Sequence, residues 1–239
     1  MKILAFDIYG DYAHFRKYYT TTSPLTFSFP PPPTIAGILG AIYGVPKNKN
    51  LKIFGYDNCQ IALQILNSVK KVRMGINLIN TKDNKYFLLL KAKNHEPRTQ
   101  IRTEFVKSPS YRVFVKHRDE KFFNELAKFI QMHKSFYTVS LGLSELLANF
   151  NFVGLYDCKE IKNFEGYINT VIPFSKLTGR GIIIEPDKRY FKEKIPIKMN
   201  TDRVVEIYGD VVYESDGKPI MASIDSVYHL ENGETITFF

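Results

Sequence analysis

The sequence predicts an α+β protein in which an antiparallel sheet carries two helices. Short apolar runs, typical of buried strands, recur along the chain. Two segments have the composition or the spacing of helices. These elements follow one another in the order β-α-β-β-α-β, with insertions, which is typical of ferredoxin-like domains and RNA-recognition motifs. We therefore expect a ferredoxin-like domain over residues 1–165 and a small β-rich C-terminal domain over 166–239.

The first expected strand covers residues 2–8. Its apolar side chains form a nearly continuous run, which is typical of a central strand covered on both faces. They are Ile3, Leu4, Ala5, Phe6 and Ile8. We therefore place this strand in the middle of the predicted sheet.

The first helix is expected over residues 34–44. Four prolines precede it, at 30–33. Because proline cannot donate to a sheet ladder or sit inside a helix, they predict an extended segment that delivers Thr34 as the helix N-cap. Small residues at 36, 37, 40, 41 and 44 form one flat face of this helix. That face predicts close packing against a sheet or another backbone.

The middle of the chain is expected to form strands. In order they cover 60–66, 72–79, 87–91, 98–107 and 111–116, with a turn at 83–85 between the second and the third. The last two flank Ser108-Pro109-Ser110, so a β-hairpin is expected near residues 95–118.

The second helix follows Asp119, a suitable N-cap. Its apolar residues lie at the spacing of one buried face, at 122, 123, 126, 129 and 130. Strands over 137–141 and 152–156 complete the first domain. The C-terminal domain is expected to hold short strands over 182–184, 204–208, 211–213, 227–230 and 235–238, with turns at 216–217 and 232–233.

Composition limits the classes of function. The 239 residues are 44% hydrophobic, which is enough for a packed core, and 33 Lys and Arg against 24 Asp and Glu give a net charge of +9. A basic chain favours an acidic partner such as nucleic acid or an anionic membrane surface. The longest apolar run, 35–45, is too short to span a bilayer, so no membrane role is expected.

The spacing of the cysteines favours a cytoplasmic protein, and the spacing of the histidines argues against a metal site. Cys59 and Cys158 are far apart and form no CxxC motif, which favours reduced thiols in a cytoplasmic protein. The five histidines show no metal-ligand spacing, so neither a zinc site nor a cofactor is expected.

The positive charge is concentrated in one segment. Residues 91–118 hold eight Lys and Arg against two Glu, a local charge of +6. Phe105, Tyr111 and Phe114 are interleaved with these cations, as in proteins that neutralise phosphates and stack unpaired bases. The alternative is an exposed hairpin whose aromatic side chains turn inward. The pattern alone leaves both interpretations open.

Three segments at the start of the chain, 6–17, 21–26 and 31–42, resemble the opening of the Cas family five proteins of CRISPR defence. Segments 98–113 and 141–145 follow in the order of that family, so the resemblance covers roughly residues 1–155. It is closest to the type I-B subgroup of this repeat-associated (RAMP) superfamily.

The resemblance implies a non-catalytic, RNA-binding subunit of the type I effector complex, Cascade, in antiviral defence. Such a subunit holds the 5′ handle of the guide RNA, the crRNA. Its implied partners are the crRNA, the repeating backbone subunit and the large subunit that reads the target-adjacent motif, with target DNA contacted indirectly. The basic hairpin would then act as a thumb that clamps the handle.

The residues expected to bind RNA are cations, an amide and an aromatic side chain. Arg16 and Lys17 follow the first strand, and Arg180 stands between two glycines that precede a strand. The other candidates belong to the expected thumb. They are Arg98, Gln100, Arg102, Lys107, Tyr111 and Arg112.

The alternative is a metal-independent endoribonuclease that processes repeat RNA, as the resemblance to the type I-C subtype suggests. Such cleavage needs a base for the 2′-hydroxyl and a cation for the phosphorane. The candidates are Tyr43, Lys116 and His117. In the type I-C pattern the Lys-His pair aligns with Lys121-Phe122, where a phenylalanine cannot transfer a proton, so the set looks incomplete. A third reading is a basic β-rich interaction protein without an RNA role.

Overall fold

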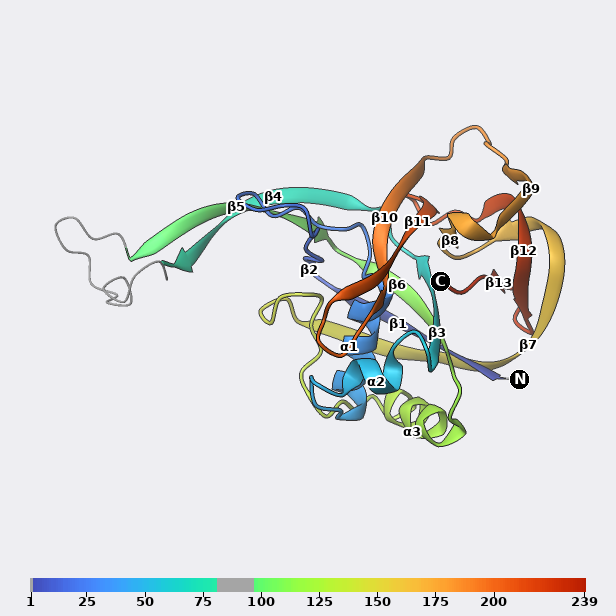
Figure 1. The fold of residues 1–239 in the computed structure, drawn as a ribbon, viewed down its shortest axis with the longest axis horizontal. Coiled ribbons are helices and arrows are strands. Elements are labelled where there is room, and N and C mark those ends of the chain that lie inside the picture. The colour runs from blue at the N-terminus through green and yellow to red at the C-terminus, as the bar shows by residue number, and fades with distance from the viewer. Residues whose placement is uncertain (1, 81–96) are drawn as a thin grey trace.

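Strands dominate the computed structural model, which describes residues 2–80 and 97–239 (Figure 1). Within these residues the strands form one sheet of seven and two sheets of three, and all of their pairings are antiparallel. The α+β class was expected from the sequence, and its combination of helices with an antiparallel sheet is confirmed. A two-stranded ribbon projects from one end of the molecule, while the C-terminal strands lie at the other (Figure 1). Among the described residues, no helix is long and apolar enough to cross a membrane.

The centre of the large sheet consists of four strands in the order β7-β1-β6-β3. Their bounds are β1 Lys2–Gly10, β3 Cys59–Ile65, β6 Ser110–His117 and β7 Ala148–Ile168. Beyond β7 lie β12 (Ile220–Leu230) and β13 (Thr235–Ile236), and β9 (Leu177–Ile182) also pairs with β12. The five apolar residues of β1 that were predicted to be buried are all fully buried. The strand lies between β7 and β6, so its predicted central position is confirmed.

The two faces of the central sheet are covered differently. Leu4, Phe6 and Ile8 of β1 face a core that includes α1 (Pro32–Tyr43) and α3 (Glu120–Gln131). Ile3 and Ala5 face a second cluster, closed by C-terminal side chains. These are Leu230, Ile236 and Phe238. The side-chain alternation of β1 therefore separates a helical layer from a layer built by the C-terminal residues.

The helix ends agree with the sequence in one case and differ in the other. Asp119 caps α3, where its side chain accepts hydrogen bonds from the backbone N–H groups of Lys121 and Phe122, as predicted. The predicted N-cap of the first helix, Thr34, is wrong. The helix begins at Pro32 after Pro31, because the first turn needs no backbone donors and tolerates proline.

The expected hairpin between residues 98–107 and 111–116 is not formed. Instead, β5 (Arg98–Lys107) pairs along its whole length with β4 (Lys70–Ile79), while β6 pairs with β1 and β3. On its other side β5 pairs with the short strand β2 (Tyr12–Ala13), so β2 and β4 are the two edges of this small sheet. The projecting ribbon is therefore β4–β5, and the predicted thumb joined the wrong strands. The predicted strand 87–91 and turn 83–85 lie outside the described residues.

The C-terminal part differs from prediction in several strands. A second small sheet has the order β10-β11-β8, with β8 (Ile172–Pro173), β10 (Tyr190–Met199) and β11 (Val205–Glu214). The two runs 204–208 and 211–213 form one strand, β11, and β10 was not expected.

The predicted strand 137–141 is wrong, since only an isolated bridge joins Ser140 to Leu147. A short 3-10 turn, Phe174–Lys176, follows β8.

The predicted domain boundary after residue 165 falls inside a strand. The first part of β7 pairs with β1 and its second part with β12, so the strand runs through this position without a break. The division into 1–165 and 166–239 stays a prediction.

The glycine face of α1 packs on α2 (Asn50–Phe54) rather than on a sheet. A Cβ added at Gly40 would lie 2.8 Å from the Cβ of Asn50, whereas one added at Gly37 would meet the Asn50 side chain at an ordinary 3.5 Å. The helix therefore needs glycine at one of these positions and not at the other.

We predict that Gly40→Leu lowers the free energy of unfolding by about 1–3 kcal/mol because the new side chain overpacks the contact with Asn50. Gly37→Ala is the matched control, and it should be neutral or stabilising by up to about 1 kcal/mol through helix propensity. Urea unfolding measures both. Equal stability of Gly40→Leu and wild-type protein would show that this face is open.

Candidate nucleic-acid interface

The register of the ribbon gives it one polar face and one apolar face. Residues paired across antiparallel strands lie on the same face, and successive residues alternate between faces. The polar face carries Lys71, Arg73, Asn77, Arg98, Gln100, Arg102 and Glu104. The opposite face carries Val72, Met74, Ile76, Leu78, Ile101 and Phe105. Ile79 and Val106 also lie on the polar face, and Lys70 and Lys107 lie at the root of the opposite face. The arginines Arg73, Arg98 and Arg102 thus form a row on one face of the ribbon.

Four of the expected RNA-binding residues lie exposed on this ribbon. Arg98, Gln100 and Arg102 follow one another on the polar face, and Lys107 stands at the root of β5, opposite Lys70 of β4. Sequence analysis missed Arg73 on the same face. Its signal was the alternation of polar Arg73, Gly75 and Asn77 with apolar neighbours in β4.

Glu104 fixes the root of the ribbon to the segment that follows β2. Its carboxylate lies 3.8 Å from the Lys71 amine and 3.6 Å from the Arg73 guanidinium, and it accepts a hydrogen bond from the backbone N–H of Thr26. Its backbone carbonyl is 2.7 Å from Nδ1 of His14. A two-stranded ribbon alone is marginally stable, so these contacts hold its orientation.

An open pocket of about 370 Å³ lies where the ribbon joins the body. Four cations line it, namely Lys17, Lys71, Arg189 and Lys192. Burial is the main cause that lowers the pKa of the Lys71 amine, and the amine donates to the carbonyl of Thr26. Glu193 is the acidic residue in the lining. Each of the four cations also has a carboxylate within ion-pair distance, namely Glu193 for Lys17, Glu104 for Lys71, Asp216 for Arg189 and Asp210 for Lys192. A phosphate chain that binds here therefore competes with these carboxylates for the cations.

Lys17 and Arg16 are both placed near the root of the ribbon. Lys17 forms an ion pair with Glu193 of β10. Burial by itself lowers the pKa of Lys17, but the hydrogen bond and charge of Glu193 outweigh it and leave the pKa raised. Arg16 is exposed and lines a second open pocket of about 560 Å³ together with Arg203.

Tyr111 and Arg112, the two thumb candidates on β6, have structural contacts. Tyr111 is 1% exposed, and its hydroxyl donates to the backbone carbonyl of Ser28 at 2.7 Å. Arg112 binds both carboxylate oxygens of Asp7, at 2.8 and 3.2 Å, and the carboxylate of Glu234 at 3.0 Å. Because both side chains already have partners within the protein, we do not include them in the proposed RNA interface.

Arg180 lies apart from the ribbon. It is exposed on β9, at the opposite end of the molecule from the ribbon (Figure 1), and its guanidinium is 3.9 Å from the Glu165 carboxylate. The structure does not bring Arg180 together with the other candidates.

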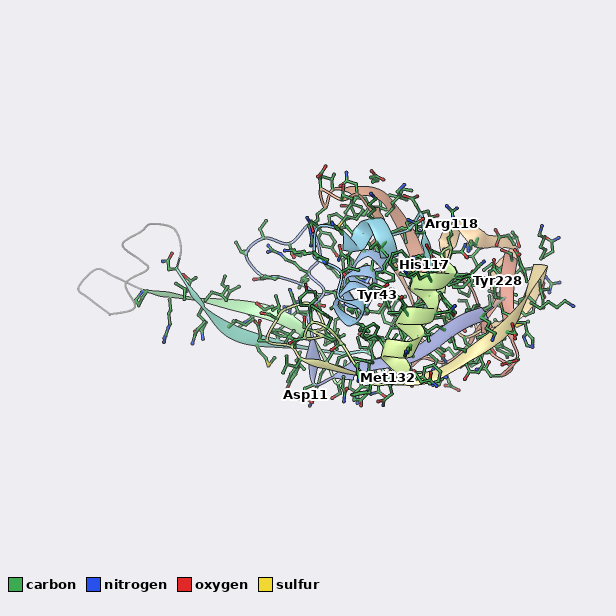
Figure 2. All side chains as sticks on the ribbon, turned by 90° about the horizontal axis from the view of Figure 1, so that it is seen from below. Asp11, Tyr43, His117, Arg118, Met132 and Tyr228 are labelled. Carbon is green, nitrogen blue, oxygen red and sulfur yellow. The ribbon has the colours of Figure 1, made fainter. Side chains whose placement is uncertain are left out.

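The nuclease candidates Tyr43 and His117 share an aromatic cluster beside α3 (Figure 2). Both rings contact Phe54 and Phe122, with centroid distances of 5.4 to 5.7 Å. No pattern in the sequence predicted that these two residues lie close together. The structure thus brings two of the three nuclease candidates close together. Whether they could act in catalysis depends on the hydrogen bonds and the pKa of each side chain.

Both groups have hydrogen-bond partners within the protein. The Tyr43 hydroxyl donates to Glu125, and burial, together with that carboxylate, raises the pKa of Tyr43 to about 12. Nε2 of His117 is 2.8 Å from the carbonyl of Ile53, and Nδ1 accepts the backbone N–H of Asp119 at 3.0 Å. Nδ1 also lies 3.1 Å from the carbonyl of Asp119, so both ring nitrogens have backbone partners.

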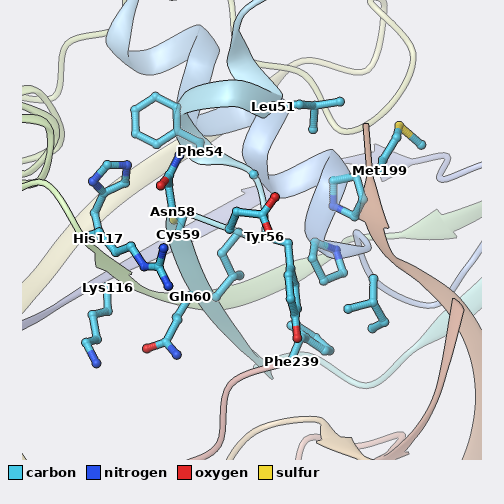
Figure 3. Close-up of a pocket in the computed structure, with 17 residues that line it drawn as sticks. Leu51, Phe54, Tyr56, Asn58, Cys59, Gln60, Lys116, His117, Met199 and Phe239 are labelled. Atoms are coloured by element: carbon cyan, nitrogen blue, oxygen red, sulfur yellow. The ribbon is translucent and has the colours of Figure 1, made fainter. Parts of the chain in front are cut away.

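Lys116 and His117 point in opposite directions from β6 (Figure 3). The Lys116 amine lies 5.4 Å from the ring centroid of Tyr228, whereas His117 contacts Phe54. Both residues line a pocket of about 430 Å³, to which Arg118 also contributes. Within residues 2–80 and 97–239, no group of three or more His, Cys, Asp or Glu side chains could hold a metal ion.

Comparisons with known proteins give a consistent result. A family model described as CRISPR-associated protein (Cas_Cas5) matches residues 3–209. A CRISPR protein from Archaeoglobus fulgidus has a similar structure, with a TM-score of 0.55 and 15% identity, over 98% of this chain and 97% of that one. A chain of a CRISPR RNA-guided surveillance complex has a TM-score of 0.54 and 10% identity, over 91% of each chain. No curated protein matches the sequence.

We predict that Arg112→Ala lowers the free energy of unfolding by roughly 1–3 kcal/mol, because Asp7 and Glu234 lose charged hydrogen bonds. Arg102→Ala, on the exposed ribbon, should change it by less than about 0.5 kcal/mol. Chemical unfolding of the two variants measures the difference. If the two variants are equally stable, the Asp7–Arg112–Glu234 cluster has no structural role.

Proposed function

Since the chain belongs to the family of CRISPR-associated Cas5 proteins, we propose that it is a non-catalytic RNA-binding subunit of a type I-B-like effector complex, Cascade. In this proposal it holds the 5′ handle of the crRNA in antiviral defence. The observation that carries the proposal is the row of exposed cations on one face of the projecting β4–β5 ribbon. This ribbon takes over the thumb role that the sequence assigned to residues 95–118.

The RNA-binding face is proposed to run from Arg98 and Arg102 towards the cation-lined pocket at the root of the ribbon. A row of cations along an extended arm can follow a phosphate chain without reading its sequence. Gln100, between the two arginines, adds an amide that can donate to a phosphate or contact a base edge. Glu104 keeps this row at a fixed angle to the body.

The sheet order supports a ferredoxin-like core. The elements β1, α1, β3, β6, α3 and β7 follow the β-α-β-β-α-β order, and their strands are adjacent as β7-β1-β6-β3. In RNA-recognition motifs the open face of such a sheet stacks bases. Here that face is closed by Leu230, Ile236 and Phe238. We therefore place the RNA on the ribbon and its root rather than on the sheet.

The proposed partners are the crRNA, the backbone subunit and the large subunit of Cascade, with target DNA contacted indirectly. The similarity to a chain of an RNA-guided surveillance complex supports a place in a multi-subunit assembly. The composition and the two isolated cysteines favour the cytoplasm for such an assembly.

A metal-independent endoribonuclease is the second candidate. One observation favours it, namely that Tyr43 and His117 contact the same two phenylalanine rings. Three observations favour the non-catalytic proposal instead: the raised pKa of Tyr43, the occupied nitrogens of His117 and the opposite direction of Lys116.

We predict that RNA binding depends on salt through the ribbon. Each lost phosphate contact should reduce the slope of log affinity against log salt by about 0.7, so Arg98→Ala with Arg102→Ala should reduce it by about 1.4. Fluorescence anisotropy with repeat RNA, over a series of salt concentrations, measures the slope.

The matched control is Lys159→Ala with Lys162→Ala, two exposed lysines on the far part of β7. This pair should leave the slope unchanged. If both double variants reduce the salt slope equally, then the total charge of the protein, rather than the ribbon, governs RNA binding.

We also predict that the purified protein binds its repeat RNA and leaves it intact in EDTA. Denaturing gel electrophoresis after prolonged incubation measures this. Specific cleavage at the handle boundary that is abolished by Tyr43→Phe or His117→Ala would support the nuclease instead. The same variants are expected to leave RNA affinity unchanged, since both side chains lie off the ribbon.

A further inference from the structure

Three tyrosines form an exposed cluster outside the ribbon. Tyr18, Tyr19 and Tyr208 are 53%, 60% and 38% exposed. The Tyr18 ring lies 4.7 Å from the Tyr208 ring and 5.1 Å from the Tyr19 ring, measured between centroids. Contiguous aromatic surface of this kind marks an interaction site, because single exposed rings are ordinary but a packed group of them is not.

The cluster joins two distant parts of the chain. Tyr18 and Tyr19 lie in the loop between β2 and α1, and Tyr208 lies on β11. The loop is held by a bridge between Arg16 and Thr26 and by a hydrogen bond from the Arg16 guanidinium to the carbonyl of Thr20 at 3.1 Å. The rings are therefore carried by a tied turn and a strand.

Two lysines lie against the rings, and the acidic neighbours of Tyr208 on β11 are themselves paired with lysines. Glu206 lies 3.4 Å from the Lys198 amine, and Asp210 lies 2.9 Å from the Lys192 amine. The Lys17 amine is 5.9 Å from the ring centroid of Tyr19, and the exposed Lys194 amine is 6.0 Å from that of Tyr208. Arg16 is exposed in the same loop. Glu193 is the acid paired with Lys17. Aromatic faces flanked by positive charge suit a ligand that is both planar and anionic, which a nucleic-acid strand is.

The tyrosine loop is attached to the root of the basic ribbon. The backbone N–H of Glu104 donates to the carbonyl of Pro24 at 2.9 Å, and the Lys71 amine donates to the carbonyl of Thr26 at 2.8 Å. Both acceptors belong to the loop that carries Tyr18. A nucleic-acid strand bound along the polar face of the ribbon would therefore reach the loop that carries Tyr18 and Tyr19.

We propose that Tyr18, Tyr19 and Tyr208 form a stacking platform for unpaired bases of single-stranded RNA. The inference rests on the proposed RNA-binding function and deepens it, since the ribbon takes phosphates while the platform takes bases. Every base has a π-face, so such a platform holds a strand without selecting its sequence. Charge complementarity and continuity with the ribbon favour RNA over an apolar protein partner.

The test compares two anionic probes with the full chain. One is an oligouridylate of about 12 nucleotides, and the other is an abasic ribose-phosphate chain of the same length. Wild-type protein should bind the oligouridylate more tightly. Tyr18→Ala with Tyr208→Ala should weaken that binding by about 5-fold to 100-fold while leaving the salt slope and the abasic affinity unchanged.

Two variants serve as controls. Tyr18→Phe with Tyr208→Phe keeps both rings and should retain wild-type affinity. Tyr167→Ala removes a tyrosine that is 52% exposed but lies on the far part of β7, and it should also have no effect. A 2-aminopurine base in the oligouridylate should lose fluorescence when it stacks on the wild-type protein, which reports stacking without any substitution.

The outcomes separate the two proposals. Equal affinity of wild-type protein for both probes, or unquenched 2-aminopurine in a bound complex, would overturn the platform and leave the ribbon as the RNA site. That result would assign the tyrosines to a protein contact. Failure to bind either probe would overturn the RNA-binding function together with the platform.

Discussion

The fold depends on a buried hydrogen-bonded joint at the start of β6. Tyr111 pairs with Ile8 of β1 and Ile65 of β3, and its buried hydroxyl donates to the carbonyl of Ser28. The Ser28 hydroxyl in turn shares a hydrogen bond of 2.7 Å with the hydroxyl of Tyr213 on β11. A buried polar group without a partner is costly, so this chain of bonds fixes the central sheet, the loop before α1 and the C-terminal sheet relative to one another.

The joint also separates structural cations from those available to a ligand. The chain leaves the ribbon at Lys107 and enters the central sheet three residues later, so one basic segment is divided between two environments. Before the joint, Arg98 and Arg102 are exposed on the arm. After it, Arg112 is enclosed by Asp7 and Glu234. Net charge in the sequence therefore overstates the charge that RNA can meet on this segment.

Local signals in the sequence were reliable where one segment determines its own structure. The apolar run of β1, the Asp119 cap of α3 and the extent of β5 were all predicted correctly. Pairing between segments was not, because Ser108-Pro109-Ser110 looks like a hairpin turn although Ser108 leads from one sheet to another with a positive φ of 48°. Strand β10 was missed because Pro196 and its charged residues weaken the strand pattern. Proline is tolerated there because β10 lies at the edge of its sheet. The tyrosine cluster gave no signal, since Tyr208 meets Tyr18 only through the fold.

The central claim is that RNA lies along the β4–β5 arm and its root, and mapping of covalent crosslinks tests it most directly. Repeat RNA that carries 4-thiouridine would be irradiated in complex with the full chain, and the linked peptides identified by mass spectrometry. The account predicts crosslinks within residues 70–79 and 98–107 and in the loop that carries Tyr18. Crosslinks confined to β9, β12 and the part of β7 that pairs with β12, at the opposite end of the molecule, would contradict it.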